Sequence, residues 1–101
     1  MIYEHKAIVT VSGGSVGTTT LNVLGGLARN LLIRALTNGG TGTIFRADLT
    51  DEDGVARVNW GYENGELNDH TLHFPITGRY TINITNASAT DTFRVILGVA
   101  E

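Results

Sequence analysis

The sequence contains no cysteine, and it has only one proline and one tryptophan among its 101 residues. The absence of cysteine excludes disulfides and thiolate metal sites, and it is compatible with folding in a reducing cytoplasm. No apolar run approaches the length that spans a bilayer, and the N-terminus lacks the basic-then-apolar layout of a signal peptide. The seven basic residues are interspersed with ten acidic ones and form no basic cluster. We therefore predict a soluble protein without its own export signal that binds neither nucleic acid nor membranes.

The length predicts one domain, residues 1–101. A chain of this size buries roughly 60–65% of its unfolded surface on folding, which suffices for a two-layer core. Ordering the chain costs on the order of 100–200 kcal/mol of conformational entropy. Because only 42% of the residues are hydrophobic, nearly all of them must be well placed.

The strongest pattern in the sequence is an alternation of apolar and polar residues through 79–86 and again through 93–100. A period of two predicts antiparallel strands with one face on a core and the other in water. The apolar residues of these two runs are Tyr80, Ile82, Ile84, Phe93, Val95, Leu97 and Val99.

Shorter runs predict further strands at 3–12, 18–24, 43–50, 55–60 and 72–76. The runs 43–50 and 55–60 flank an acidic turn and form a predicted hairpin, with Ala56, Val58 and Trp60 on one face and Trp60 in the core. Pro75 cannot donate to a ladder, so its strand belongs at an edge. We predict an all-β fold, an antiparallel β-sandwich of seven or eight strands with Greek-key or jelly-roll connections.

The segment Leu27 to Thr37 fits two structures. Leu27, Leu31 and Ala35 recur at helical spacing, and alanine, leucine and arginine favour helices. The flanking glycine pairs, the lack of a capping box and the neighbouring strands favour a strand. We predict a strand; a helix here would give a sandwich with one helix attached.

Two patterns formally match catalytic or metal sites. The run 13–17 fits the G-x-S-x-G motif, but that motif acts at a strand-to-helix turn, and here it connects two predicted strands. His70 and His73 are three residues apart, so on a regular strand they point to opposite faces and cannot share a metal ion. We predict no catalytic residue, no metal and no cofactor.

Asp48, Asp51 and Asp53 offer a third possibility, because a tight turn with several carboxylates is the kind of site that calcium accepts. The spacing does not match the twelve-residue calcium loop, and aspartate with glycine is also what a plain hairpin turn prefers. The sequence leaves calcium binding at these three residues open.

The segment 78–88, Gly-Arg-Tyr-Thr-Ile-Asn-Ile-Thr-Asn-Ala-Ser, followed by Asp91-Thr92-Phe93, resembles the C-terminal half of small β-sandwich virion proteins of tailed bacteriophages. Residues 32–35 and 49–54 also resemble upstream segments of such proteins. The resemblance implies a structural protein that is not an enzyme, namely a capsid decoration or cement protein on the head exterior. It further implies a location in the virion after synthesis in the host cytoplasm. The implied partners are the major capsid protein or other virion proteins, and further copies of the chain in a homo-oligomer.

Loops and uncovered strand edges are the natural contact surfaces of such a module. We predict that the N-terminal strand and the polar stretch 61–70 form the partner interface, with Tyr3, His5, Tyr62, Asn64, Glu66 and His70. One alternative is a phage tail, baseplate or fibre component with the same sandwich. Another is a carbohydrate-binding module, which requires Trp60 or Tyr62 to be exposed beside a groove or calcium site.

Overall fold

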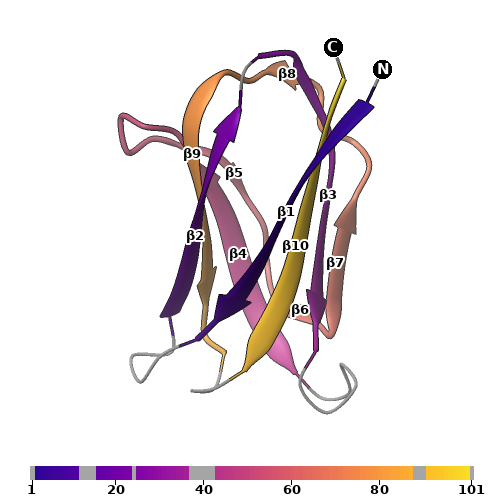
Figure 1. Ribbon diagram of the computed structural model, residues 1–101. Helices are drawn as coiled ribbons and strands as arrows, with labels where there is room; N and C mark the ends of the chain where they lie inside the picture. Colours follow the sequence, from indigo (N-terminus) through magenta and orange to yellow (C-terminus); the bar gives the residue numbers. More distant parts are fainter. Residues whose placement is uncertain (1, 12–15, 24, 37–42, 88–90, 101) are drawn as a thin grey trace.

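The computed structural model describes residues 2–11, 16–23, 25–36, 43–87 and 91–100. Within these ranges the chain forms ten β-strands and no helix (Figure 1). In chain order they are β1 (Ile2–Thr10), β2 (Val16–Val23), β3 (Leu27–Ala35), β4 (Ile44–Thr50), β5 (Ala56–Asn59), β6 (Glu63–Asn64), β7 (Glu66–Asp69), β8 (Phe74–Pro75), β9 (Gly78–Thr85) and β10 (Thr92–Ala100).

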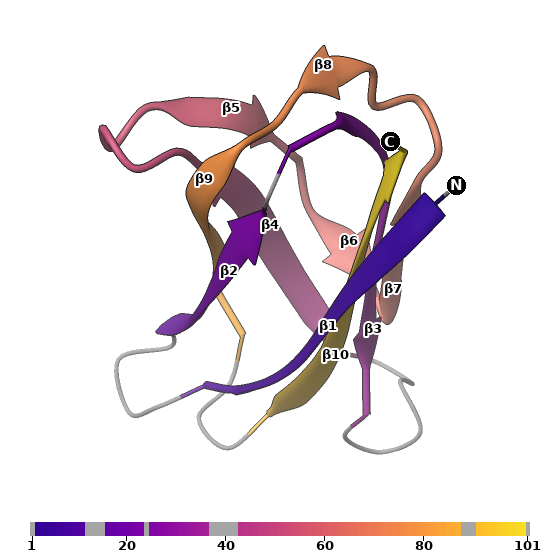
Figure 2. The same ribbon diagram turned by 45° about the horizontal axis from the view of Figure 1, so that its top comes forward.

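The strands form two antiparallel sheets that pack face to face (Figures 1 and 2). The first, here called the β1 sheet, has the order β1-β10-β3-β7 with β8 also beside β3; the second, the β2 sheet, has the order β2-β9-β4-β5 with β6 beside β4. The first strand pairs with the last, β1 with β10, and the second strand pairs with the second to last, β2 with β9, so that one pair is nested inside the other along the chain. This nesting across two sheets is the jelly-roll arrangement of two Greek keys. The predicted β-sandwich is therefore confirmed.

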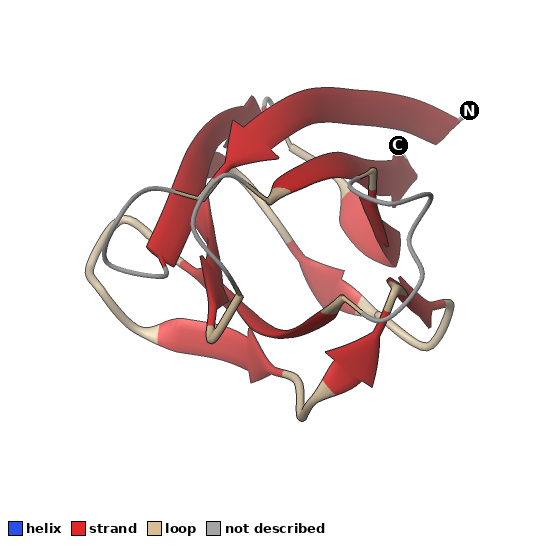
Figure 3. Ribbon diagram, turned by 90° about the horizontal axis from the view of Figure 1, so that it is seen from below, coloured by secondary structure: helices blue, strands red, loops and turns tan. Residues whose placement is uncertain are grey.

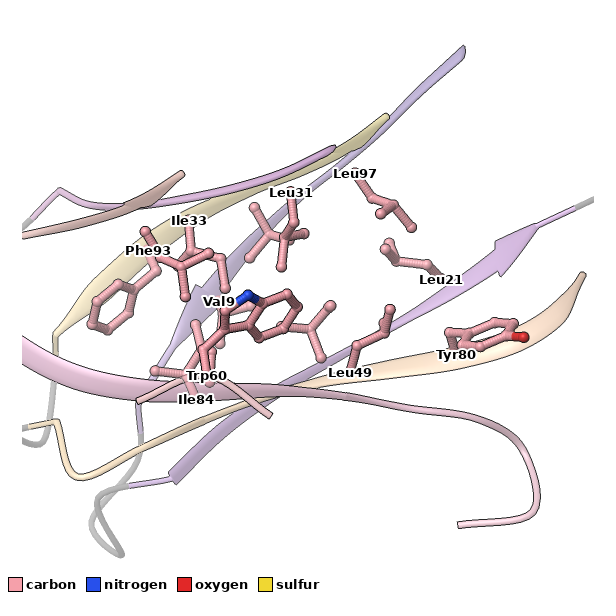
Figure 4. Packing of buried hydrophobic residues seen from close by; sticks show 14 of the residues in the cluster. Val9, Leu21, Leu31, Ile33, Leu49, Trp60, Tyr80, Ile84, Phe93 and Leu97 are labelled. Atoms are coloured by element: carbon pink, nitrogen blue, oxygen red, sulfur yellow. The ribbon is translucent and has the colours of Figure 1, made fainter. Parts of the chain in front are cut away.

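The hydrophobic core lies between the two sheets (Figure 4). All seven apolar residues of the two C-terminal runs are buried, as the alternation predicted. Phe45 on β4 and Phe93 on β10 meet across the core, with ring centroids 4.8 Å apart and planes inclined by 59°. Tilted aromatic pairs of this kind contribute beyond the area that they bury. The core is thus formed by side chains that the alternation along each strand places on its inner face, and their packing holds the two sheets together.

The segment that fitted either a helix or a strand is the strand β3. It pairs with β10 on one side and with β7 and β8 on the other, and Ala28, Leu31, Ile33 and Ala35 are buried. The helical alternative is wrong, because a strand in the middle of the sheet satisfies both of its hydrogen-bonding edges. Gly26 leads into β3 with a φ of 137°, and a Cβ atom here would lie 2.5 Å from a backbone oxygen of β10.

The polar stretch 61–70 contains two short strands, where the sequence predicted a loop. Gly65, with a φ of 81°, lies at the turn between them; β6 before it pairs with β4, and β7 after it pairs with β3. The chain therefore crosses between the two sheets at this turn. Seen from below, the described segments are strands and loops, with no helix (Figure 3). Leu67 is the apolar residue that attaches β7 to the core, and it is 2% exposed. A single apolar residue among polar ones carries too little periodic signal to predict a strand.

The predicted hairpin of β4 and β5 is confirmed, but one of its three inward residues is not buried. Trp60 lies in the core and Val58 packs against it, whereas Ala56 is exposed. The pairing passes from Leu49–Val58 to Thr50–Ala56, so Arg57 is the extra residue of a bulge. A bulge interrupts the alternation of faces, which is why the period-two prediction fails at Ala56. Pro75 lies in the edge strand β8, as predicted.

Candidate interaction surfaces

The six residues predicted as a partner interface lie on two separate edges of the sandwich. Tyr3 and His5 belong to β1, and the other four lie on or beside β6 and β7; β1 and β7 are at opposite ends of the strand order of their sheet. Tyr3 is 45% exposed and His5 is half-buried. In Figures 1 and 2, β1 diverges from β2 toward the N-terminus. The predicted residues therefore do not form one continuous surface.

Tyr62 and Asn64 contribute to an exposed cluster beside β4. Asn64 pairs with Ile44, and the next outward position along the two strands brings the Tyr62 ring to Arg46, whose guanidinium carbon lies 5.3 Å from the ring centroid. Ile44 is 52% exposed and Tyr62 is 65% exposed. We call Ile44, Arg46 and Tyr62 the β6 patch. Its amphipathic ring, aliphatic side chain and cation are typical of protein contact surfaces.

A second exposed cluster lies on the outer face of the β1 sheet, and the sequence prediction missed it. Lys6 is opposite Ile96, and Ile8 is opposite Arg94, so the two isoleucines are diagonal neighbours on one face. Ile8 is 55% exposed and Ile96 is partly exposed. We call these four residues the β1 patch. The sequence feature that could have revealed this patch is that Ile8 and Ile96 occupy outward positions of regular strands, where polar residues are expected.

On the same face, Arg34 of β3 forms an ion pair with Glu66 of β7. Both Nε and Nη2 of Arg34 donate to Oε1 of Glu66, at 3.0 and 2.9 Å. Glu66, one of the predicted interface residues, thus joins neighbouring strands through an exposed ion pair. Pairs of this kind contribute little to stability, about 0–1 kcal/mol.

Asp69 links the segment that crosses between the sheets, residues 63–69, to the core, and we call this the crossing segment. Its Oδ2 accepts a 2.8 Å hydrogen bond from Nε1 of Trp60, while Oδ1 accepts from the backbone N–H of Thr71 at 2.8 Å and from the Thr71 hydroxyl at 2.5 Å. The hydrogen bond from the Thr71 hydroxyl, followed by that from Trp60, lowers the pKa of Asp69 below its ordinary value. His70 follows directly and is exposed. Each oxygen of the Asp69 carboxylate already accepts a hydrogen bond from the protein, so this group of residues has a structural role.

The three aspartates considered for calcium do not converge. Asp48 accepts hydrogen bonds from Thr50 and Asn83 on the outer face of the β2 sheet, at 2.8 and 2.7 Å. Asp51 instead closes the hairpin turn, where its Oδ1 accepts from the backbone N–H groups of Asp53 and Val55. Among the described residues, no group of three histidine, aspartate or glutamate side chains is placed to hold a metal ion.

Ser15 of the G-x-S-x-G pattern lies outside the described residues, so the structure gives no position for its hydroxyl. Gly17 lies in β2 and is buried, and a Cβ atom there would lie 2.7 Å from Cγ1 of Val9. This glycine therefore allows β1 and β2 to approach closely, which is a packing role. His70 and His73 are both exposed.

Within the part of the chain that is described, no helix is long and apolar enough to cross a membrane. No protein-family model matches the sequence, and no curated protein matches it.

Several solved structures are similar to this fold. The Drosophila NLP core, from a study of pentamer formation and histone binding, has a TM-score of 0.57 and 9% identity over 100% of this chain and 99% of that one. The CBM36-1 domain of a multidomain xylanase from the hindgut metagenome of Trinervitermes trinervoides has a TM-score of 0.49 and 13% identity, over 96% and 98% of the two chains. The pre-peptidase C-terminal domain of a Bacillus anthracis collagenase has a TM-score of 0.47 and 18% identity, over 95% and 87%. At 9% identity, the likeness to the NLP core shows a shared fold alone.

Proposed function

We propose that this protein is a non-enzymatic structural component of a tailed-phage virion that decorates and stabilises the head. The observation that carries the proposal is that large apolar side chains are exposed on both sheets, Ile8 of the β1 patch on β1 and, in the β6 patch, Ile44 on β4 and Tyr62 just before β6. Exposed apolar clusters on a rigid body mark protein contact sites. Two such clusters on different sheets allow one copy to contact two partners at once.

The sequence resemblance in residues 78–88 and 91–93 supports the same role. A decoration protein binds a repeating lattice, so weak contacts of each copy are multiplied by avidity. The NLP core, which shares the fold, is described as forming a pentamer, so this sandwich is compatible with assembly around a symmetry axis. We assign the β6 patch to the contact with the head, because it includes Tyr62 and lies beside Asn64, both predicted as interface residues.

The test is co-sedimentation of the purified protein with undecorated phage heads. We expect saturable binding at a fixed ratio to the capsid subunits. The double variant Ile44→Thr/Tyr62→Ser removes the apolar part of the β6 patch, and we expect its apparent affinity to fall about tenfold or more. Leu36→Thr is the matched control, since Leu36 is also exposed, at 38%, but lies beyond the end of β3 in the other sheet. Absence of wild-type binding to heads would refute the proposal, and binding to tails alone would favour the tail or baseplate alternative.

A carbohydrate-binding module is the second candidate, and the 65% exposure of the Tyr62 ring favours it. Trp60 does not, because it is buried and its N–H is bonded to Asp69. Titration with soluble plant and bacterial glycans, followed by calorimetry, separates the two candidates. Glycan binding that Tyr62→Ser abolishes would favour the carbohydrate-binding module over the virion role.

A further inference from the structure

We propose that the β1 patch is the docking site for the β4–β5 turn of a second copy of this chain. The inference rests on the proposed structural role, because it names the contact through which neighbouring copies join. It assigns the β1 patch to contact between copies and leaves the β6 patch for the head.

The β1 patch has the shape and composition of a surface that binds a protruding segment of another protein. Together with Ala7, its four residues line a shallow hollow of about 570 Å³ on the outer face of β1 and β10. Lys6 has only a loose ion pair, 3.7 Å from Glu4, and both side chains are more than half exposed. Arg94 has no ion pair with any described residue. An apolar centre between two available cations fits a partner that presents an apolar side chain beside carboxylates.

The turn between β4 and β5 presents that chemistry. Asp51, Glu52 and Asp53 are consecutive, so three of the ten acidic residues of the chain lie at this turn, and Val55 beside them is 55% exposed. We call residues 51–55 the acidic turn. It complements the β1 patch in charge and matches it in apolar character.

The acidic turn is also held in one conformation before any partner binds. The Asp51 carboxylate accepts from the N–H of Asp53 at 3.0 Å and from that of Val55 at 2.9 Å, and the Asp51 backbone accepts from Gly54 at 3.0 Å. Gly54 has a φ of 82°, which lets the chain reverse tightly. A preorganised segment loses less conformational entropy on binding than a flexible one.

The position of the turn makes the contact intermolecular. In Figures 1 and 2 the turn between β4 and β5 projects from the side of the sandwich away from β1 and β10. A contact between two different surfaces of identical copies is heterologous, and it generates a ring if the rotation closes. Each copy then offers its turn to one neighbour and its β1 patch to the other.

The experiment uses two charge reversals and their mixture, analysed by sedimentation velocity. The first variant is Glu52→Lys/Asp53→Lys, which keeps Asp51 because that side chain holds the turn together. The second is Lys6→Glu/Arg94→Glu. We expect the wild type to self-associate. In each variant alone, like charges then meet, so we expect the apparent dissociation constant of self-association to rise about tenfold or more.

The mixture is the decisive arm. An equimolar mixture should associate again, with the two variants alternating, since the basic turn of the first variant fits the acidic patch of the second, and the native turn of the second fits the native patch of the first. Arg46→Glu in the β6 patch is the control and should self-associate normally. Circular dichroism checks that each variant retains its β-sheet spectrum.

The inference is overturned if the wild type remains monomeric up to its solubility limit, if the reversals leave sedimentation unchanged, or if the mixture does not reassemble. Because no heads are present, the result is distinct from the test of the proposed function. Self-association without head binding would refute the virion role alone, and head binding by a wild type that never self-associates would refute this inference alone.

Discussion

Replacing Asp69 with asparagine tests how the crossing segment is fastened to the core. An amide offers one acceptor oxygen, where the carboxylate offers two. If that oxygen stays with Thr71, the amide N–H₂ group faces the indole N–H of Trp60, and a buried donor loses its acceptor. An unsatisfied buried group costs about 1–3 kcal/mol, and the remaining hydrogen bonds lose their charge assistance. Because the two bonds from Thr71 are exposed and the bond from Trp60 is part-buried, we expect Asp69→Asn to lower the free energy of unfolding by about 1–2 kcal/mol.

The assay is urea denaturation, followed by the fluorescence of the single tryptophan, Trp60, and independently by circular dichroism. Asp53→Asn is the matched control, because it removes the same charge from an exposed turn, and we expect a change within about 0.5 kcal/mol. Equal stabilities for Asp69→Asn and Asp53→Asn would refute the conclusion that the Asp69 carboxylate fastens this segment.

The pH dependence gives a second check on the same group. The pKa of Asp69 is lowered below its ordinary value of 3.8, first by the Thr71 hydroxyl and then by Trp60. A lowered folded-state pKa means that the stabilisation is present above the unfolded-state pKa and is lost as the pH falls through the folded-state pKa. The stability difference between wild type and Asp69→Asn should therefore be full near neutrality and should shrink below about pH 4. A difference that grows on acidification would contradict this assignment.

Three further changes test the core, a close backbone contact and a surface ion pair. Phe93→Ala removes a fully buried ring and should lower the free energy of unfolding by about 3–5 kcal/mol in denaturant titrations. Gly26→Ala forces a Cβ atom against the backbone of β10 at a φ of 137°, so we expect a loss of about 2–4 kcal/mol. In contrast, Gly61→Ala should be nearly neutral, since a Cβ atom added there would meet nothing within 4 Å beyond its chain neighbours; equal effects at the two glycines would refute the steric argument. Glu66→Gln breaks the exposed pair with Arg34 and should change the unfolding free energy by no more than about 1 kcal/mol, with a smaller effect at high salt, in thermal or urea melts.

Local patterning predicted most of the strands and the inward residues of the C-terminal runs. It also predicted the core position of Trp60, the hairpin of β4 and β5, and the edge position of Pro75. These features depend on neighbouring residues, because side chains on a strand alternate between two faces wherever the strand finally lies. The exposed apolar residues Ile8 and Ile96 were visible in the same alternation, as exceptions on the outward side.

The candidate surfaces could be predicted only in part. Sequence reasoning selected Tyr62 and Asn64 from a polar stretch, but it had no means of knowing that Tyr62 meets Arg46, since that contact depends on β6 pairing with β4. It also grouped Tyr3 with His70, although the strand order separates their edges. Proximity between residues distant in sequence is set by strand pairing, and an alternating pattern alone does not encode which strands pair.

The amino-acid sequence by itself determined that this chain forms strands with one apolar face, because that property follows from each residue and its immediate neighbours. The tertiary structure alone decided that β1 pairs with β10, that residues 63–69 cross between the sheets, and that Ala56 turns outward at a bulge. The physical reason is that the free energy of these arrangements comes from burying both apolar faces against each other, and this depends on all the strands together.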